Sequence, residues 1–279
     1  MAARRTVRLV ALGYLALLLA APVGMVFFRA FEHGLGPFFD ALTTDGAQHA
    51  LYLTLLVVAI AVPANTAFGI GCALLLARRR FRGQAVLDRL IDLPFAISPV
   101  VIGLALILVY GQDGWLGSTF ADAGIRIIFS TPGIVLATIF VSLPFVVREV
   151  LPVLREIGDE QEQAAHTLGA SRWQAFRRIT LPAIRPAVIY GVVLSTARAL
   201  GEFGAVSVVS GRLEGETETL TLYVQNRFEG FDMTAAYATA VLLALLGIGV
   251  LVALTVLSRR RLLTGAPPLG GSPGKRIRA

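Results

Sequence analysis

Lysine is almost absent from this sequence. Among the 25 basic residues in a chain of 279, Lys275 is the single lysine. A P-loop needs the pattern Gly-x4-Gly-Lys-Ser/Thr to hold nucleotide phosphates. Lys275 follows Gly274, but Leu269 stands where the first glycine should be, and Arg276 follows the lysine. The chain therefore has no P-loop for ATP hydrolysis, and we expect neither an enzyme nor a cofactor bound by this chain.

Cysteine and histidine are also scarce. Cys72 is the only cysteine, which excludes an intrachain disulfide bond. The three histidines, His33, His49 and His166, fall on separate segments, so we expect no metal cluster. These absences exclude a disulfide-stabilised scaffold and give no support to a metal-dependent activity.

Charged residues are few as well, and the gaps between them are long apolar stretches. They make up 15% of the chain, whereas a soluble domain has roughly 25%. A helix of about 20 apolar residues spans the hydrocarbon core, and it is the only single segment that satisfies its own backbone in lipid. We predict an all-α membrane bundle of six transmembrane helices, at about residues 9–28, 50–77, 91–111, 132–150, 186–209 and 233–258.

The remaining segments flank or interrupt this transmembrane domain of residues 9–258. We expect a short tail at 1–8, a large loop at 151–183, and a disordered tail rich in glycine and proline at 259–279. The first span could instead be a cleaved signal peptide, because Arg4-Arg5 precede it and Ala20-Ala21 lie near its end.

Prolines and glycines recur within the predicted spans. Pro94 and Pro99, in the third span, could be ordinary kinks or hinges for a gate. Small residues let membrane helices approach closely. We expect this role for three glycine pairs, Gly69-x-Gly71, Gly201-x-x-Gly204 and Gly247-x-Gly249.

Basic residues are unevenly distributed between the two sides of the bundle. With six spans and the N-terminus inside, the inner segments hold 20 basic residues and the outer loops hold 4. This positive-inside bias places both termini in the cytoplasm. It also accounts for the net charge of +7 without a nucleic-acid partner, so we expect contact with membrane lipid and none with nucleic acid.

The predicted inner loop carries a spaced pattern that a lipid-embedded helix would not need. Its residues are Glu162, Gln163, Ala164, Ala165, Gly169, Ile179, Leu181 and Pro182. We expect a short helix that ends at Gly169 in a left-handed conformation, and a second helix capped by Ser171. Leu181-Pro182 would then mark the return of the chain into the membrane.

Two interpretations of this loop are open. Gln163, Ala164, Thr167 and Leu168 could share one face of the first helix, and the small side chains nearby would let a soluble partner approach closely. The loop would then be a coupling helix that docks in a groove of an ATPase. The alternative is a helix on the membrane surface that has no partner.

An ionisable pair lies within the predicted fifth span. Arg198 and Glu202 are four residues apart and can pair on one helical face. Charges at membrane depth usually face a bundle interior or a wet cavity. The pair is therefore either a structural salt bridge or part of the substrate path, to which Ser207 and Ser210 could add hydroxyl groups.

Four segments resemble one family of membrane permeases. They are Asp92–Val101, Pro144–Glu149, Leu168–Ser171 and Arg198–Gly211, and with the loop pattern they resemble the W-type permease subunit of bacterial sulfate/thiosulfate importers over about residues 50–257. The core Ala197–Gly204 is shared with molybdate permeases, whereas Ala205–Gly211 favours the sulfate branch. The family usually has Glu-Ala-Ala where this chain has Gln163-Ala164-Ala165.

The resemblance implies the fold of a type I ABC importer permease in the bacterial inner membrane, which works by alternating access. It implies three kinds of partner: a second, different permease chain, two ATP-binding cassette ATPase subunits that bind ATP and Mg²⁺, and a periplasmic or extracellular sulfate-binding protein. The loop pattern would be the ATPase-coupling site.

Uptake of a dianion against an inside-negative potential needs an energy source. At 100 mV, sulfate works against about 4–5 kcal/mol. The predicted outer loops hold ten acidic and four basic residues, so we expect anions to arrive bound to a carrier protein. Three alternatives stay open: an importer of molybdate or another oxyanion, an ion-coupled secondary transporter or channel, and a membrane scaffold that transports nothing.

Overall fold

The computed structural model describes residues 2–262, apart from some side chains near the two ends of this range and that of residue 121. Within that range every regular element is a helix, and η1 and η2 are π-helical turns. The elements are α1 (Ala2–Leu15), η1 (Ala16–Ala20), α2 (Ala21–Phe31), α3 (Leu35–Leu42), α4 (Asp45–Arg78), α5 (Gln84–Ala96), α6 (Pro99–Tyr110), α7 (Gly117–Asp122), α8 (Thr131–Ile157), α9 (Glu160–Thr167), α10 (Arg172–Ala175), η2 (Phe176–Thr180), α11 (Leu181–Leu200), α12 (Val206–Val209), α13 (Leu220–Glu229) and α14 (Met233–Leu262).

The third predicted span is not one helix. Among the described residues, five helices are long and apolar enough to cross a membrane. A sixth crossing requires α5 and α6 together, and the chain bends by 113° between these two helices. The break lies at Ile97 and Ser98, which both have extended ψ angles near 135°. Pro99 causes it, because proline disfavours the helical conformation of the residue before it. The prediction of a continuous helix over 91–111 is therefore wrong.

The fifth span is displaced from its predicted position. It runs over Arg172–Leu200 instead of 186–209, because the π-helical turn η2 joins α10 to α11 without a loop. Leu181-Pro182 therefore begins an α-helix inside a continuous rod, and Pro182 occupies a first-turn position that tolerates a missing N–H. At the other end the helix stops at Gly201, so that Glu202 lies outside it.

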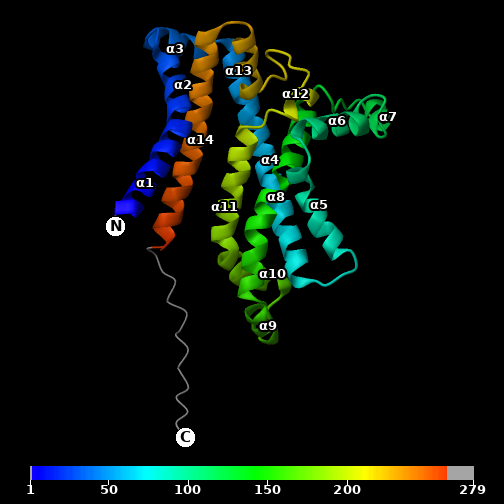
Figure 1. Ribbon diagram of the computed structural model, residues 1–279. Helices are drawn as coiled ribbons and strands as arrows, with labels where there is room; N and C mark the ends of the chain where they lie inside the picture. The colour runs from blue at the N-terminus through cyan, green and yellow to red at the C-terminus, as the bar shows by residue number, and fades with distance from the viewer. Residues whose placement is uncertain (1, 263–279) are drawn as a thin grey trace.

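The chain ends also differ from the predicted limits. Helix α1 begins at Ala2 and helix α14 continues to Leu262. The rest of the predicted disordered tail, 263–279, lies outside the described residues. The start of α1 and the end of α14 both point toward the end of the molecule that carries α9 (Figure 1).

Three helices, α4, α8 and α11, form the centre of the bundle (Figure 1). A Cβ atom on Gly69 of α4 would lie 2.7 Å from Cβ of Val146, and one on Gly191 of α11 would lie 2.9 Å from the Cα of Val146. The predicted close approach is thus confirmed at Gly69. Gly71 and the pair Gly247 and Gly249 have no atom within 4 Å of such a Cβ, so the predicted close approach does not occur at these three glycines within the described part of this chain.

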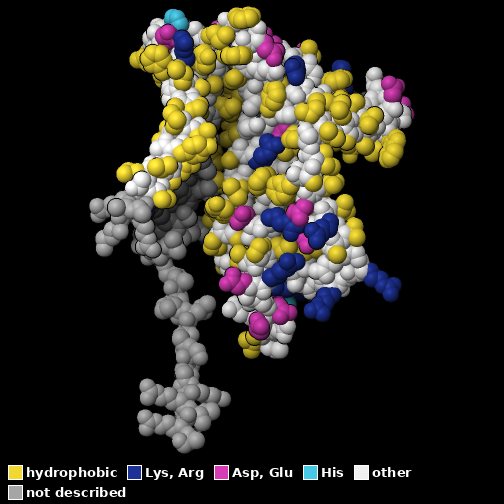
Figure 2. All heavy atoms as spheres, viewed as in Figure 1, with side chains coloured by type: hydrophobic (Ala, Val, Ile, Leu, Met, Phe, Trp, Pro, Cys, Tyr) yellow, Lys and Arg dark blue, Asp and Glu magenta, His cyan; other side chains and the backbone are white. Residues whose placement is uncertain are grey.

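Peripheral elements surround this core. Helices α2 and α3 pack on α14, while α6 and α7 form an arm to one side of the bundle (Figure 1). The first span is Thr6–Phe31, and an apolar window of 18 residues in this span has no residue buried within the chain. Charged side chains of both signs gather over the end that carries α9 and α10, beyond a largely hydrophobic surface (Figure 2).

Candidate functional site

The predicted loop pattern forms a helical elbow at one end of the bundle. Helix α8 ends at Ile157 with Gly158 as its C-cap, and α9 begins at Glu160. Gly169 has a φ of +83°, and the Ala170 N–H donates to the Ala165 carbonyl at 3.0 Å. This left-handed residue ends α9 as predicted, because glycine adopts such a φ without a Cβ clash.

The second half of the elbow is closed by a capping box. The Gln174 N–H donates to Oγ of Ser171 at 3.3 Å, and the Ser171 N–H donates to Oε1 of Gln174 at 2.8 Å. These bonds satisfy two of the donors that a helix start leaves free. The prediction that Ser171 caps the next helix is confirmed, and α10 continues directly into η2 and α11.

The predicted face of α9 is fully accessible. Gln163, Ala164, Thr167 and Leu168 are all exposed, and all eight residues of α9 lie outside the buried core. Leu168 is 88% exposed, and Trp173 on α10 is 64% exposed. Large exposed apolar side chains gathered on one surface are typical of a face that a partner protein or a membrane covers.

Glu162 points away from this face and toward the bundle. Its carboxylate accepts hydrogen bonds from Nη2 of Arg78 at 3.0 Å and from Oγ1 of Thr180 at 2.8 Å. Arg78 is the last residue of α4, and Thr180 is the last residue of η2. The same guanidinium donates through Nη1 to the Leu154 carbonyl of α8 at 2.7 Å.

The Ile-x-Leu-Pro part of the pattern lies beside this ion pair. Ile179 and Leu181 are half-buried, and Leu181 packs against the hydrophobic core that α4, α8 and α11 share. Pro182 is exposed. The structure thus brings Glu162 to Thr180, within residues 179–181, while the neighbouring Gln163 points about 100° away and is exposed.

A second ion cluster ties α5 to α8, and sequence reasoning missed it. Arg148 donates through Nε to Oδ1 of Asp92 at 2.6 Å and through Nη1 to Oδ1 of Asp88 at 2.8 Å. Asp88 and Asp92 are four residues apart and so lie on one helical face. That spacing, opposite a lone arginine in the following span, is the signal that could have revealed the cluster.

Arg198 and Glu202 form the ion pair that their spacing predicts, although Glu202 lies beyond the end of α11. Nη1 of Arg198 lies 2.6 Å from Oε2 of Glu202, and Oε1 accepts the Ala205 N–H at 2.8 Å. Glu202 is 3% exposed. Thr221 donates to the Glu202 carbonyl at 2.8 Å, so the turn is also held to α13.

The two serines that follow are engaged with nearby backbone. Oγ of Ser207 donates to the Gly204 carbonyl at 2.9 Å, and Oγ of Ser210 accepts the Arg212 N–H at 3.1 Å. Ser210 is fully buried, whereas Arg198 keeps 29% of its side chain exposed. Of the four predicted path residues, Arg198 and Ser207 are thus partly exposed, whereas Glu202 and Ser210 are buried.

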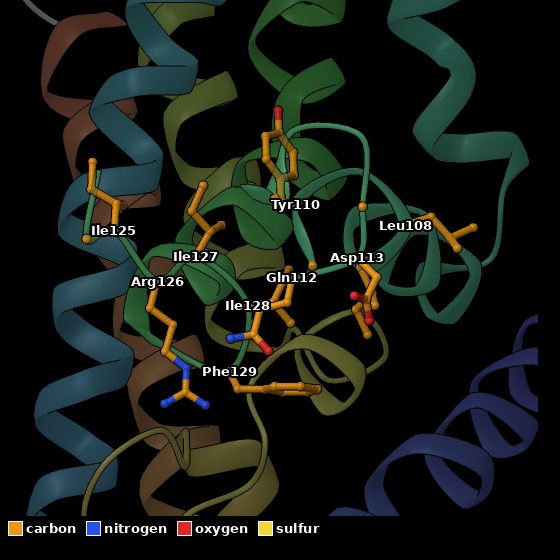
Figure 3. A pocket seen from close by; sticks show the side chains of 14 residues that line it. Leu108, Tyr110, Gln112, Asp113, Ile125, Arg126, Ile127, Ile128 and Phe129 are labelled. Atoms are coloured by element: carbon orange, nitrogen blue, oxygen red, sulfur yellow. The ribbon is translucent and has the colours of Figure 1, made fainter. Parts of the chain in front are cut away.

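A pocket of about 690 Å³ lies against the α6–α7 arm. Figure 3 shows Arg126 and Asp113 on opposite sides of it. Among its described lining residues, Arg126 is the one cation and Asp113 the one carboxylate. The pocket therefore has no net charge that would favour a dianion, and it does not coincide with either candidate site.

The sequence matches the family described as binding-protein-dependent transport system inner membrane component over residues 65–263. The chain belongs to this family. The matched range begins inside α4. It includes Arg78, the whole elbow, Arg198 and Glu202. Membership of this family and the apolar helices make the chain an inner-membrane transport component.

Curated relatives of this family member are similar over most of their length. The sulfate transport system permease protein CysW of Synechocystis sp. (strain PCC 6803) is 52% identical over 250 residues, which cover 90% of this chain and 91% of that protein. CysW of Escherichia coli (strain K12) is 48% identical, with 84% and 80% covered. CysT of the same strain is 39% identical, with 81% and 82% covered.

A solved structure shares the fold. The crystal structure of a bacterial alginate ABC transporter, in complex with an alginate pentasaccharide-bound periplasmic protein, contains a chain that aligns with a TM-score of 0.77 at 19% identity. The alignment covers 94% of this family member and 96% of that chain. The predicted ABC importer permease fold is therefore confirmed, and the likeness concerns the fold alone.

Proposed function

We propose that this chain is the membrane-spanning permease subunit of an ATP-driven importer that carries sulfate or thiosulfate into the cell. The observation that carries the proposal is the identity of about half of all aligned residues with CysW sulfate permeases over nearly the whole of both chains. An alignment of 250 residues in a chain of 279 must span the segments that hold Arg198 and the elbow, and is not confined to one apolar segment.

The energy for uptake would come from separate ATPase subunits. The sequence has no P-loop, so two ATP-binding cassette subunits would bind ATP and Mg²⁺. The exposed face of Gln163, Ala164, Thr167 and Leu168 would dock on them, with Ala165 and Gly169 giving close access. The excess of basic residues in the predicted inner segments supports cytoplasmic termini, and α9 would then lie on the side where such ATPases would bind.

The remaining partners follow from the relatives. CysT proteins are about 40% identical to this chain, which supports a second permease of different sequence as its partner in a heterodimer. An external sulfate-binding protein would deliver the anion, because acidic residues prevail in the predicted outer loops. Arg198 would contact the anion in the path, with Glu202, Ser207 and Ser210 shaping the turn around it.

Reconstitution of the four kinds of subunit in liposomes tests the proposal. Labelled sulfate should accumulate only when ATP, the ATPase and the binding protein are all present. Uptake that continues without the ATPase would identify an ion-coupled transporter or channel instead. Competition by molybdate at equimolar concentration, stronger than competition by unlabelled sulfate, would assign the chain to the molybdate branch.

A further inference from the structure

One carboxylate side chain of helix α9, that of Glu162, faces the transmembrane bundle and bonds to it. None of its eight residues is buried. Among these eight, Glu162 is the one whose side chain is hydrogen-bonded to the candidate membrane spans, through Arg78 and Thr180. The other polar side chains with bonds, His166 and Thr167, contact only backbone carbonyls of the elbow itself.

Four elements converge on this carboxylate. Arg78 brings the end of α4, and its Nη1 also holds the Leu154 carbonyl at the end of α8. Thr180 brings η2 and so the start of α11, at a buried position that is 2% exposed. π-helical turns such as η2 are often found where a helix serves a function.

We propose that Glu162 is the positioning residue that passes movement of α9 to α4 and α11, a role that does not belong to the motif position Gln163. This inference rests on the proposed function, in which an ATPase moves α9. Gln163 faces outward and contacts the docking partner, whereas Glu162 faces inward and holds the moving helix to the spans.

The geometry of the contact suits this role. Arg78 donates through Nε to Oε2 of Glu162 and through Nη2 to Oε1, so the guanidinium and the carboxylate form a bidentate pair. Such forked, charge-assisted bonds are stronger and more directional than neutral ones. The two side chains are only 16% and 21% exposed, so water and salt screen them less than a surface pair.

The neighbouring core would carry the movement onward. Leu76, Leu154 and Ile184 lie within a few residues of the contact and belong to one buried cluster on α4, α8 and α11. Close-packed interiors have low compressibility and transmit displacement instead of absorbing it. A shift of Glu162 would therefore displace the ends of three helices together.

Two substitutions at the contact and two controls test the inference in the complete reconstituted transporter. The variants are Glu162→Gln, which removes the charge, and Thr180→Val, which removes the hydroxyl while keeping the shape. The controls are Thr180→Ser, which keeps the hydroxyl that Thr180→Val removes, and Glu156→Gln, which neutralises an exposed carboxylate near the end of α8. The measured quantity is the amount of sulfate transported per ATP hydrolysed.

Both contact variants should lower this ratio by about tenfold, within the range of coupling between two sites, while ATP hydrolysis continues. Both controls should keep the wild-type ratio. A purely structural loss would reduce transport and hydrolysis by the same factor and leave the ratio unchanged, which would overturn the inference. A wild-type complex that moves no sulfate with ATP would instead overturn the proposed function itself.

Discussion

At the scale of single residues, the left-handed glycine of the elbow decides how α9 meets α10. Gly169 has a φ of +83°, and a Cβ atom at this position would have no atom within 4 Å. Backbone strain, and not a lack of space, therefore makes a larger residue unfavourable at this position. The strain of an L-residue in this conformation is about 1–2 kcal/mol, and it is greatest for β-branched residues.

Gly169→Val should weaken coupling without preventing folding. The strained cap would depopulate the native elbow by roughly 5- to 30-fold, which follows from about 1–2 kcal/mol. Sulfate uptake per ATP hydrolysed by the reconstituted complex measures the effect. Gly169→Asn is the matched control, because asparagine tolerates the left-handed region, and it should retain most of the wild-type ratio. Wild-type coupling in the valine variant would contradict the role of the elbow.

A buried carboxylate in the segment before α13 gives a prediction about pH. Burial raises the pKa of Glu218 above the ordinary 4.5, a hydrogen bond from Asn226 lowers it, Glu214 raises it and Arg227 lowers it, with a net rise. The folded state therefore binds this proton more tightly than the unfolded state. Stability from this group is complete below the ordinary pKa and is lost as the pH rises through the folded pKa.

Glu218→Gln should therefore raise the midpoint of thermal unfolding near pH 7.5, because the glutamine never charges, while its oxygen still accepts from Asn226. The gain should disappear near pH 4, where Glu218 is protonated in both states. Unfolding of the purified chain in detergent at several pH values gives the measurement. Glu216→Gln, an exposed carboxylate of the same segment, should leave the profile unchanged.

At the scale of elements, the bundle depends on the close contact among α4, α8 and α11. Val146 lies between Gly69 and Gly191, and a Cβ atom on either glycine would come within 3 Å of it. Gly71, two residues further along α4, faces open space. The two glycines of one pair thus have opposite environments.

Gly69→Val should destabilise the chain, because the added methyl groups would overpack the contact at a cost of about 1–3 kcal/mol. Gly71→Val provides a matched control with the same loss of glycine and the same gain in volume. Thermal unfolding in detergent should show a clearly lower midpoint for the first variant and a small change for the second. Equal effects would mean that helix propensity, and not packing, governs this part of α4.

The helix caps and the ion pair at Arg198 could be predicted because both depend on residues within one or two turns. Gly169, Ser171 and the i, i+4 spacing of Arg198 and Glu202 specify local geometry. Where one span ends or bends depends on backbone geometry that hydropathy does not record. The apolar run through Ile97, for example, continues across the break that Pro99 imposes.

Contacts between distant segments were beyond a reading of one sequence. Arg78 and Glu162 are 84 positions apart, and nothing local distinguishes Arg78 from the arginines that follow it. Glu162 and Gln163 were both among the predicted coupling residues, but the sequence did not show which of them faces the bundle. On a helix, neighbours point about 100° apart, so only one of the two could face it, and that residue is Glu162.

At the scale of the whole molecule, the orientation of the bundle in the membrane is the prediction that the remaining ones assume. The exposed turn between α4 and α5 contains Arg82, and the segment before α13 contains the exposed Glu216. These two segments lie at opposite ends of the molecule (Figure 1). The excess of basic residues predicts that the first of them is in the cytoplasm.

Single added cysteines at these two positions test the orientation. A membrane-impermeant thiol reagent should label Glu216→Cys in intact cells from outside, and should label Arg82→Cys only after the membrane is permeabilised. Cys72 is buried, so the unmodified chain should stay unlabelled and is the control. Labelling of Arg82→Cys from outside would reverse the orientation and place α9 beyond reach of a cytoplasmic ATPase.

The length of α4 has a mechanical consequence. Its 34 residues make a rod of about 51 Å, and a tilt of about 5° at Arg78 would sweep the opposite end through about 4 Å. That end hydrogen-bonds to α13, through Thr44 and Tyr223 at 3.2 Å. Under the proposed function, the helix would act as a lever, in which a small stroke at the end near α9 becomes a larger displacement at the opposite end of the bundle.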